Sequence, residues 1–154
     1  MTQFNPNGNP LPIQFDADGN LPPGIHVLTL AEASLLLVFN NRREVLFDGF
    51  LRARSCLREA GCQKIYIGGS FATSKEFPGD FDACWDTTNV NLELLKKVEP
   101  ALLDLSNNCA AQKVKFGGEL FPADLPTTVS GVSHLDFFQN DRDDRPKGIV
   151  CIHS

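Results

Sequence analysis

One segment of the chain, residues 65–86 (IYIGGSFATSKEFPGDFDACWD), constrains the fold more than any other. Residues 64–68 are rich in β-branched and aromatic side chains, which predicts a short buried strand, and the Gly-Gly-Ser sequence at 68–70 predicts a turn after it. Over residues 80–86 polar and apolar side chains alternate, so we predict a second strand that turns its apolar residues toward a core. Two strands joined by a loop are therefore the starting point for the whole fold.

Two acidic residues lie on the polar face of that second strand. Asp80 and Asp82 are two positions apart, so their carboxylates should share a face, about 7 Å apart at the Cα atoms. Like charges this close are unfavourable unless a cation or a proton lies between them. Mg²⁺ suits such a pair, because it binds one or two protein carboxylates together with substrate phosphates, and two ions can clamp a phosphoryl transfer. Phe81 would anchor the strand from the core side. The alternative is an accidental Asp-x-Asp on a surface hairpin.

The turn before the aspartates has the composition of a phosphate site. Gly69 lets the backbone approach a bulky anion, and the amides of residues 69–71 can face phosphate oxygens, helped by a short helix that begins at Ser70. Lys75 could neutralise a triphosphate, or it could be an exposed loop lysine. Lys147 has the same two interpretations, a phosphate contact or a surface ion pair. Gly69, Ser70 and Lys75 are therefore the predicted nucleotide-binding residues.

Taken together, Gly69-Ser70 and Asp80-Phe81-Asp82 resemble the active-site signature of the polymerase-β nucleotidyltransferase superfamily, in its small bacterial minimal branch. Residues 21–26 and 145–150 extend the resemblance to a poorly characterised bacterial family of such proteins. The resemblance implies a short mixed sheet with helices packed on it, Mg²⁺ as two ions, and a nucleoside triphosphate, with ATP favoured. It implies transfer of a nucleoside monophosphate to a hydroxyl of a protein, a tRNA end or a small molecule, in a toxin–antitoxin component.

The same superfamily carries a third carboxylate on a later strand, and two residues could supply it here. Glu119 lies in the strand-like piece 116–121, whereas Asp124 lies beyond Pro122, where a loop is expected. We therefore favour Glu119, which completes a predicted catalytic and metal-binding set with Asp80 and Asp82. A chain with only two of these ligands would bind nucleotide without transferring it. The alternative function is thus a non-catalytic nucleotide-binding or partner-binding module of the same fold.

Capping signals and periodicity predict the remaining elements. Thr29 and Glu32 have the spacing of a capping box, so a short helix should follow. Asn40 or Asn41 can cap a second helix, which should end at Gly61. Further helices are predicted over residues 92–105, with a break at Pro100, and over 108–115 and 128–139, and further strands over 118–121 and 147–152. We expect an irregular arm over residues 1–23 and one α/β (α+β) domain over residues 24–154, a short mixed sheet with flanking helices.

The second helix is rich in arginine. Its apolar residues recur at three- and four-residue spacing, and the arginines fall mostly on its other faces. A solvated surface is the simplest interpretation, and an RNA-binding or phosphate-binding role is the alternative. The arginines are Arg42, Arg43, Arg52, Arg54 and Arg58.

Composition excludes several classes of protein. A net charge of -5 over 154 residues argues against a protein that binds DNA by blanketing its phosphates, and there is no DNA-binding signature. The five cysteines form no C-x-x-C pair, so we expect buried free thiols rather than a disulfide framework or a zinc ribbon. The N-terminus has no secretory signal pattern and no apolar run is long enough to cross a membrane, so we expect a cytoplasmic protein.

Overall fold

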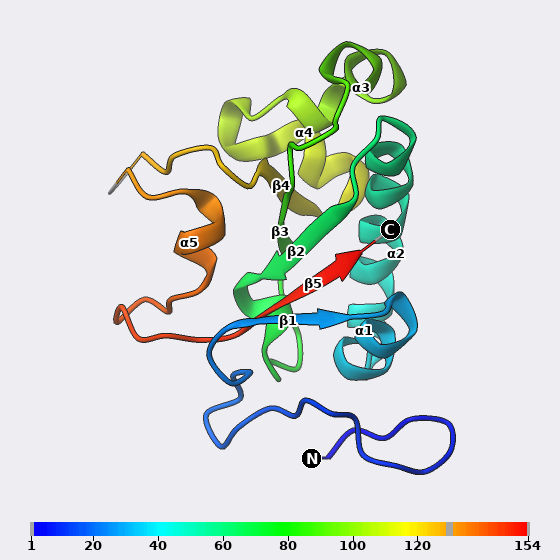
Figure 1. Cartoon of the computed structure of the whole chain (residues 1–154), viewed down its shortest axis with the longest axis vertical. Coiled ribbons are helices and arrows are strands. Elements are labelled where there is room, and N and C mark those ends of the chain that lie inside the picture. Colours follow the sequence, from blue (N-terminus) through cyan, green and yellow to red (C-terminus); the bar gives the residue numbers. More distant parts are fainter. Residues whose placement is uncertain (1, 129–130, 154) are drawn as a thin grey trace.

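The computed structural model describes residues 2–128 and 131–153, which form an α+β fold (Figure 1). A mixed five-stranded sheet consists of β1 (Ile25–Leu28), β2 (Lys64–Gly68), β3 (Phe81–Trp85), β4 (Gly118–Pro122) and β5 (Ile149–His153). The α-helices are α1 (Leu30–Leu37), α2 (Asn41–Glu59), α3 (Leu92–Val98), α4 (Ser106–Phe116) and α5 (His134–Phe138). Two 3-10 helices, η1 (Gly69–Ala72) and η2 (Pro100–Leu103), complete the described elements.

The order of the strands brings the predicted site together. The sheet runs β1-β5-β2-β3-β4, with β1 parallel to β5, β3 parallel to β4, and the central pairs antiparallel. Strand β3 therefore lies between β2, which ends at the Gly-Gly-Ser turn, and β4, which carries Glu119. Asp82 is opposite Gly68 on one side and opposite Glu119 on the other. The short mixed sheet predicted from the sequence is confirmed.

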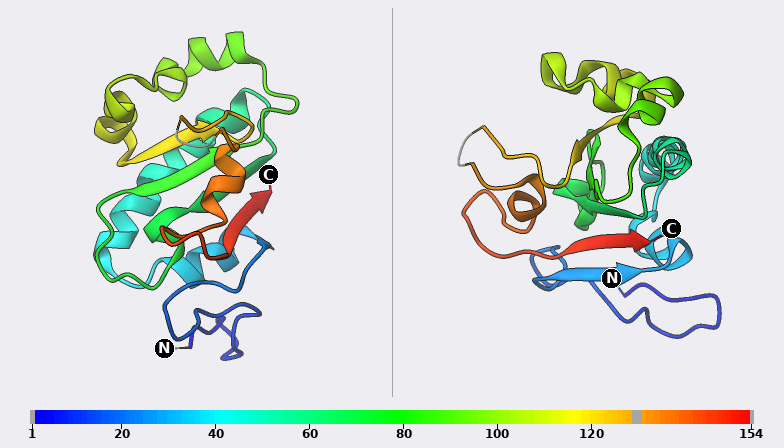
Figure 2. Two further views of the ribbon diagram at one scale, coloured as in Figure 1. Left: turned by 90° about the vertical axis from the view of Figure 1, so that its left-hand side faces the viewer. Right: turned by 45° about the horizontal axis from the view of Figure 1, so that its top comes forward.

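The alternation predicted for β3 sorts its residues between two layers. Phe81, Ala83 and Trp85 are buried in the larger core, where Phe81 meets Phe50 of α2 edge to face, with ring centroids 5.8 Å apart. Cys84 points the other way, into a smaller cluster with residues of α5, β5 and the segment after β4. Helices α1 and α2 thus cover one face of the sheet and α5 covers part of the other (Figure 2).

The caps of the first two helices follow the predicted chemistry. The side chain of Thr29 accepts a hydrogen bond from the Glu32 amide while Glu32 accepts one from the Thr29 amide, so the capping box is confirmed. Asn40, rather than Asn41, caps α2 by accepting from the Arg43 amide. Gly61 follows the last turn of α2 with φ +102°, a backbone angle that favours glycine.

Three predictions of secondary structure need correction. The helix predicted over residues 128–139 is wrong in length: α5 begins only after its cap Ser133, because a bridge between Pro126 and Ser133 and a left-handed Gly131 (φ +75°) hold the preceding chain in a loop. Residues 129 and 130 of that prediction lie outside the described part. Strand β1 was not predicted, since it has four residues and pairs with a strand 124 residues later, with Ile25 opposite Ile149. The backbone of Asn107–Cys109 is left-handed, so α4 is regular only beyond these residues.

The N-terminal arm is irregular but attached. Residues 2–23 contain no helix or named strand, while Leu11 and Leu21 are buried in the main core. A bridge between Asn20 and Thr73 connects the arm to the loop that precedes β3. Within the described residues no helix is long and apolar enough to cross a membrane.

Candidate metal and phosphate site

Three carboxylates converge at the end of the sheet where β3 begins. Asp80 immediately precedes β3, Asp82 is its second residue, and Glu119 lies opposite Asp82 on the parallel strand β4. One oxygen from each of the three lies within 4.8 Å of the others. Asp124, the other candidate for the third position, instead accepts a hydrogen bond from the Thr87 hydroxyl at 3.3 Å in the loop beyond β4. The strand alternation predicted for Glu119 therefore brings it, and not Asp124, to the two aspartates.

Gly69 makes room for one of these carboxylates. Its φ is +60°, and a Cβ at this position would collide with the carboxylate of Asp82. Only glycine tolerates both the backbone angle and this approach. Gly69 is the first residue of η1, and Ser70, which follows it, is half-buried. The structure thus brings the predicted Gly-Ser turn against the acidic cluster, and the group that lies closest to Gly69 is Asp82.

The basic side chains of the protein compensate the negative charge of Asp82 only in part. Burial, first of all, and the negative charges of Asp80 and Glu119 together raise the pKa of Asp82 to about 7. Lys147 and Lys113 oppose this rise. The half-buried Lys147 has a pKa lowered by burial, an effect that Asp141 and Asp82 counteract. The two lysines therefore act as partial counter-ions of the acidic cluster.

Lys113 was not singled out in the sequence. It lies in the last turn of α4, and its Nζ is 3.3 Å from the Glu119 Oε1 across the turn that joins α4 to β4. Lys75, which was singled out, is exposed, and its backbone carbonyl accepts hydrogen bonds from Arg43. A role of the Lys75 side chain in nucleotide binding stays a prediction.

The interpretation of the arginines as a solvated surface is wrong for Arg43. Its side chain is fully buried, with the guanidinium 4.3 Å from the ring centroid of Phe39 and 4.9 Å from that of Phe71. Burial lowers its pKa to about 10. Among residues 2–128 and 131–153, the partners of the guanidinium are all backbone carbonyls, those of Leu37, Ser70, Phe71, Thr73 and Lys75. Arg43 therefore holds the Gly-Ser turn and the loop after it.

Neighbouring residues of α2 hold the rest of that loop. Arg42 donates to the carbonyls of Pro78 and Gly79, immediately before Asp80. The side-chain amide of Asn40 donates to the Glu76 carbonyl at 2.6 Å. The first turn of α2 therefore fixes residues 70–79 from end to end, and with them the spacing of Ser70 from Asp80. One signal in the sequence was available: cations at a helix N-terminus oppose the helix dipole, so two arginines there require another partner.

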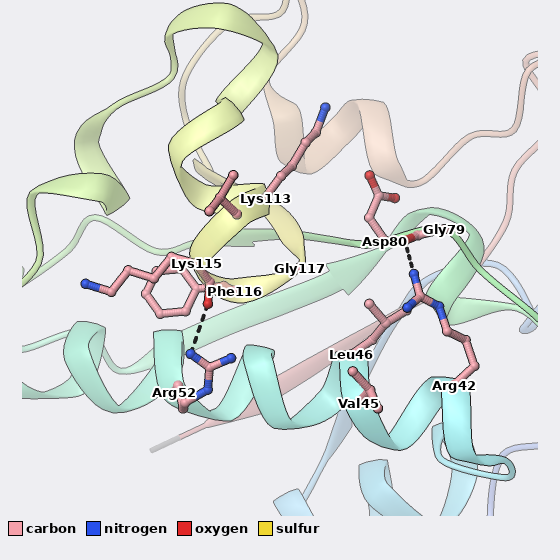
Figure 3. Close-up of a pocket in the computed structure, with 11 residues that line it drawn as sticks. Arg42, Val45, Leu46, Arg52, Gly79, Asp80, Lys113, Lys115, Phe116 and Gly117 are labelled. Atoms are coloured by element: carbon pink, nitrogen blue, oxygen red, sulfur yellow. Dashed lines mark hydrogen bonds between the residues drawn. The ribbon is translucent and has the colours of Figure 1, made fainter.

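A groove of about 440 Å³ begins at the acidic cluster and runs between α2 and α4 (Figure 3). Asp80 lies at one end, beside Arg42, and Arg52 and Lys115 lie toward the other end. The two helices approach closely at Gly49, where a Cβ would collide with the Phe116 carbonyl. Within the cluster, Asp82 thus lies against the Gly-Ser turn, and Asp80 lines the groove together with basic side chains of α2 and α4.

Comparison with known proteins gives a single family. Residues 13–153 match DUF6932, described as a family of unknown function. The chain belongs to this family. The DUF6932 match extends over all five strands, the Gly-Ser turn and the three carboxylates. Comparison with the curated proteins gives no match, and comparison with the solved structures gives none.

Proposed function

We propose that this chain is a Mg²⁺-dependent nucleotidyltransferase that moves a nucleoside monophosphate from a nucleoside triphosphate, with ATP favoured, to a hydroxyl acceptor. The observation that carries the proposal is the convergence of Asp80, Asp82 and Glu119 beside the Gly69-Ser70 turn. An acidic cluster alone is common on protein surfaces. Here it lies against a glycine turn whose backbone is fixed by Arg43, and the order of turn and aspartates resembles the polymerase-β signature.

The residues present fit a divalent cation. Asp80, Asp82 and Glu119 offer carboxylate oxygens, the ligands that Mg²⁺ prefers, and their separation leaves room for phosphate oxygens and water in the remaining positions. The raised pKa of Asp82 means that bringing the three charges together is unfavourable without a cation. When bound, Mg²⁺ would stabilise the negative charge on the reacting phosphate and on the leaving pyrophosphate.

The phosphates of the nucleotide would lie on the Gly-Ser side of the carboxylates. The Ser70 hydroxyl and the amides of the turn can donate to non-bridging phosphate oxygens. Lys147, which the charge of Asp82 attracts, supplies a cation close to the same place. Arg43 fixes these donors before the nucleotide arrives, which removes part of the entropy cost of binding.

The transfer itself is an in-line displacement. The oxygen of the acceptor hydroxyl attacks the α-phosphorus, and a new O–P bond forms as the bond from the α-phosphorus to the α,β-bridging oxygen breaks. That oxygen leaves with pyrophosphate, and the hydroxyl proton passes to the Glu119 carboxylate. Glu119 suits this role because its side chain is partly exposed and one of its carboxylate oxygens lies within 4.8 Å of an oxygen of Asp80, which lines the groove from which an acceptor could enter.

One observation favours a second candidate, a module that binds nucleotide without transferring it. The Glu119 carboxylate pairs with Lys113 at 3.3 Å, so a cation of the protein already occupies one side of the proposed base. If that ion pair persists when nucleotide binds, Asp80 and Asp82 alone would hold Mg²⁺. The chain would then sense a nucleotide or present it to a partner protein.

Labelled nucleotides distinguish the two candidates. The protein is incubated with Mg²⁺, a cell lysate and each of the four triphosphates labelled at the α-phosphorus, and the products are separated into protein, RNA and small molecules. We expect Mg²⁺-dependent labelling that Asp82→Asn reduces at least about 100-fold, because transition-state charge is no longer stabilised. Asp124→Asn, which changes the rival carboxylate, should keep the wild-type level. Equal labelling by wild type and Asp82→Asn would overturn the proposal, and nucleotide binding without labelling would favour the second candidate.

A further inference from the structure

Helix α5 lies across the face of the sheet that carries the carboxylates, and it rests on the glycine turn. A Cβ on Gly68, which is opposite Asp82, would come within 3.3 Å of three side-chain atoms of Phe138. At the other end of the helix, His134 stacks on Phe121 of β4 with ring centroids 4.1 Å apart. The helix therefore runs from β4 to the end of β2, beside the acidic cluster (Figure 2).

The two flanks of α5 face different parts of the sheet. Leu135 packs against the small apolar cluster around Cys84, which lies two residues beyond Asp82 on the same face of β3. Phe137 follows two positions later, about 200° around the helix, so it projects from the opposite flank. That flank is turned back toward Asp82 and the other carboxylates. Phe137 is 51% exposed, and its ring centroid is 6.1 Å from that of Phe138.

Phe137 takes no part in the packing that holds α5 on the sheet. Among the described residues, the two apolar core clusters do not include Phe137, whereas its neighbour Phe138 belongs to the smaller one. An aromatic ring that packing does not require, on the flank that faces three carboxylates, is available to a ligand. Resting on the proposed function, we infer that Phe137 stacks on the base of the bound nucleoside triphosphate.

The groups at the end of α5 determine which part of the nucleotide lies beside the helix. The Lys147 amide donates to the Gln139 carbonyl at 2.9 Å, so the chain that follows α5 returns a cation to its end, and the charge of Asp82 attracts this cation. Lys147 and the Ser70 hydroxyl are the donors proposed for the phosphates. With the phosphates between these two residues, the nucleoside extends along the flank of α5 that carries Phe137.

The other surface next to the carboxylates does not suit a base. Asp80 lines the groove between α2 and α4 together with Arg42 and three further basic side chains, so that surface is charged. A nucleobase is uncharged and offers a flat π-face, which stacks on aromatic side chains. Such a stack typically contributes about tenfold or more in affinity, and it requires no hydrogen bond to the edge of the base. Of the two surfaces, the aromatic flank of α5 therefore fits the base.

Binding of the base can be measured separately from binding of the phosphates and from transfer. One probe is α,β-methylene-ATP, whose α,β bridge the transfer cannot break, and the other is inorganic tripolyphosphate, which has no base. Each is titrated with Mg²⁺ in a calorimeter. Phe137→Ala should weaken binding of α,β-methylene-ATP at least about tenfold and binding of tripolyphosphate less than about twofold. Phe4→Ala in the N-terminal arm is the matched control, because Phe4 is 52% exposed, and it should change neither affinity.

Phe137→Trp reports the contact directly. The one natural tryptophan, Trp85, is fully buried, so its fluorescence should not respond to a ligand at the surface. The substitution keeps an aromatic face, so α,β-methylene-ATP should bind at least as tightly as to the wild type. We expect this probe to quench the fluorescence of the variant and tripolyphosphate to leave it unchanged.

The outcomes separate this inference from the function on which it rests. If Phe137→Ala and Phe4→Ala bind α,β-methylene-ATP equally well, the inference is wrong while the nucleotide site stands. If Phe137→Ala weakens both probes to the same extent, the ring supports the phosphate site and not the base, and the inference is again wrong. If the wild type binds neither probe with Mg²⁺, the proposed function fails and the inference fails with it.

Discussion

The two sides of the carboxylate cluster are built in different ways. On one side, the loop over residues 70–79 has almost no secondary structure, yet the first turn of α2 holds it through hydrogen bonds to its carbonyls. On the other side, the segment that contains α5 covers the sheet through a small apolar cluster around Phe138. In the loop, hydrogen bonds from the fully buried Arg43 take the place of those of a helix or a sheet. On the other side, the five-residue helix α5 is held by apolar packing. The comparison shows that an irregular loop can be held in place by more interactions than a helix on the other side of the same site; we call these two sides the walls of the site.

Replacement of Arg43 should have the largest effect on this comparison. Arg43→Met removes all the hydrogen bonds that the guanidinium donates to the carbonyls of the loop. Buried carbonyls without a donor destabilise the folded state. We expect the free energy of unfolding to fall by about 3–5 kcal/mol, measured by urea denaturation. Arg58→Met, an exposed arginine of the same helix, should change it by less than about 0.5 kcal/mol. Equal effects of the two variants would mean that the loop does not depend on Arg43.

Replacement of Phe138 tests the other wall and should have an intermediate effect. Phe138→Ala removes the central side chain of the cluster that α5 forms with Cys84 and Ile149. We expect a loss of about 2–3 kcal/mol, at the low end for a buried phenylalanine because the cluster is small. Amide hydrogen exchange should accelerate in α5 and in the turns around it, while the amides of η1 keep their protection. Faster exchange in η1 to the same extent would show that the two walls unfold as one unit.

The charge of Asp82, which lies between the two walls, should have the smallest effect on stability. Its pKa of about 7 exceeds the ordinary value of 3.8, so the folded state binds this proton more tightly than the unfolded state. The resulting penalty is absent below pH 4 and develops as the pH rises through 7. In chelator, Asp82→Asn should therefore raise the melting temperature by about 5 °C at pH 8 and hardly at all at pH 4.

Two controls accompany that measurement. Asp86→Asn, at the far end of β3, should not give this stabilisation at pH 8, because the Asp86 side chain accepts from the Thr88 amide away from the cluster. Addition of Mg²⁺ at pH 8 should raise the melting temperature of the wild type and leave that of Asp82→Asn nearly unchanged. A stabilisation by Asp82→Asn that is the same at both pH values would contradict the crowding of charge proposed for the cluster.

Local patterns were sufficient for much of the fold. The alternation in residues 80–86 predicted which side chains of β3 face the main core, and the capping residues predicted where α1 and α2 begin. The choice of Glu119 over Asp124 needed only the two-residue period of a strand and a proline that ends it. Each of these depends on residues within a few positions of one another, which is the range over which sequence patterns are informative.

What could not be predicted depends on contacts between distant segments. Arg43 meets carbonyls about 30 residues later in the chain, and no periodicity within α2 distinguishes it from a solvated arginine. Lys113 reaches Glu119 only because of the left-handed Gly117 that reverses the chain between α4 and β4. The short helix α5 replaced a longer predicted one because a bridge from Pro126 to Ser133 competes with helix formation. The positions of the acidic residues in the candidate site could therefore be predicted from the sequence, whereas the positions of the basic residues around them could not.

The pairing of β3 with β4 makes the acidic cluster sensitive to chain length. Asp82 and Glu119 face each other because the parallel register places them side by side, and successive residues of a strand point to opposite faces. Removal or insertion of a single residue in the turn at Gly117 would turn the Glu119 side chain toward the face of the sheet that α2 covers. The hydrogen bonds between β3 and β4 could still form, with the register shifted by one residue. The sheet would survive and the third carboxylate would be lost. If the proposed function holds, a one-residue change of length would therefore remove the proposed base and leave Asp80 and Asp82 to bind the nucleotide without transferring it.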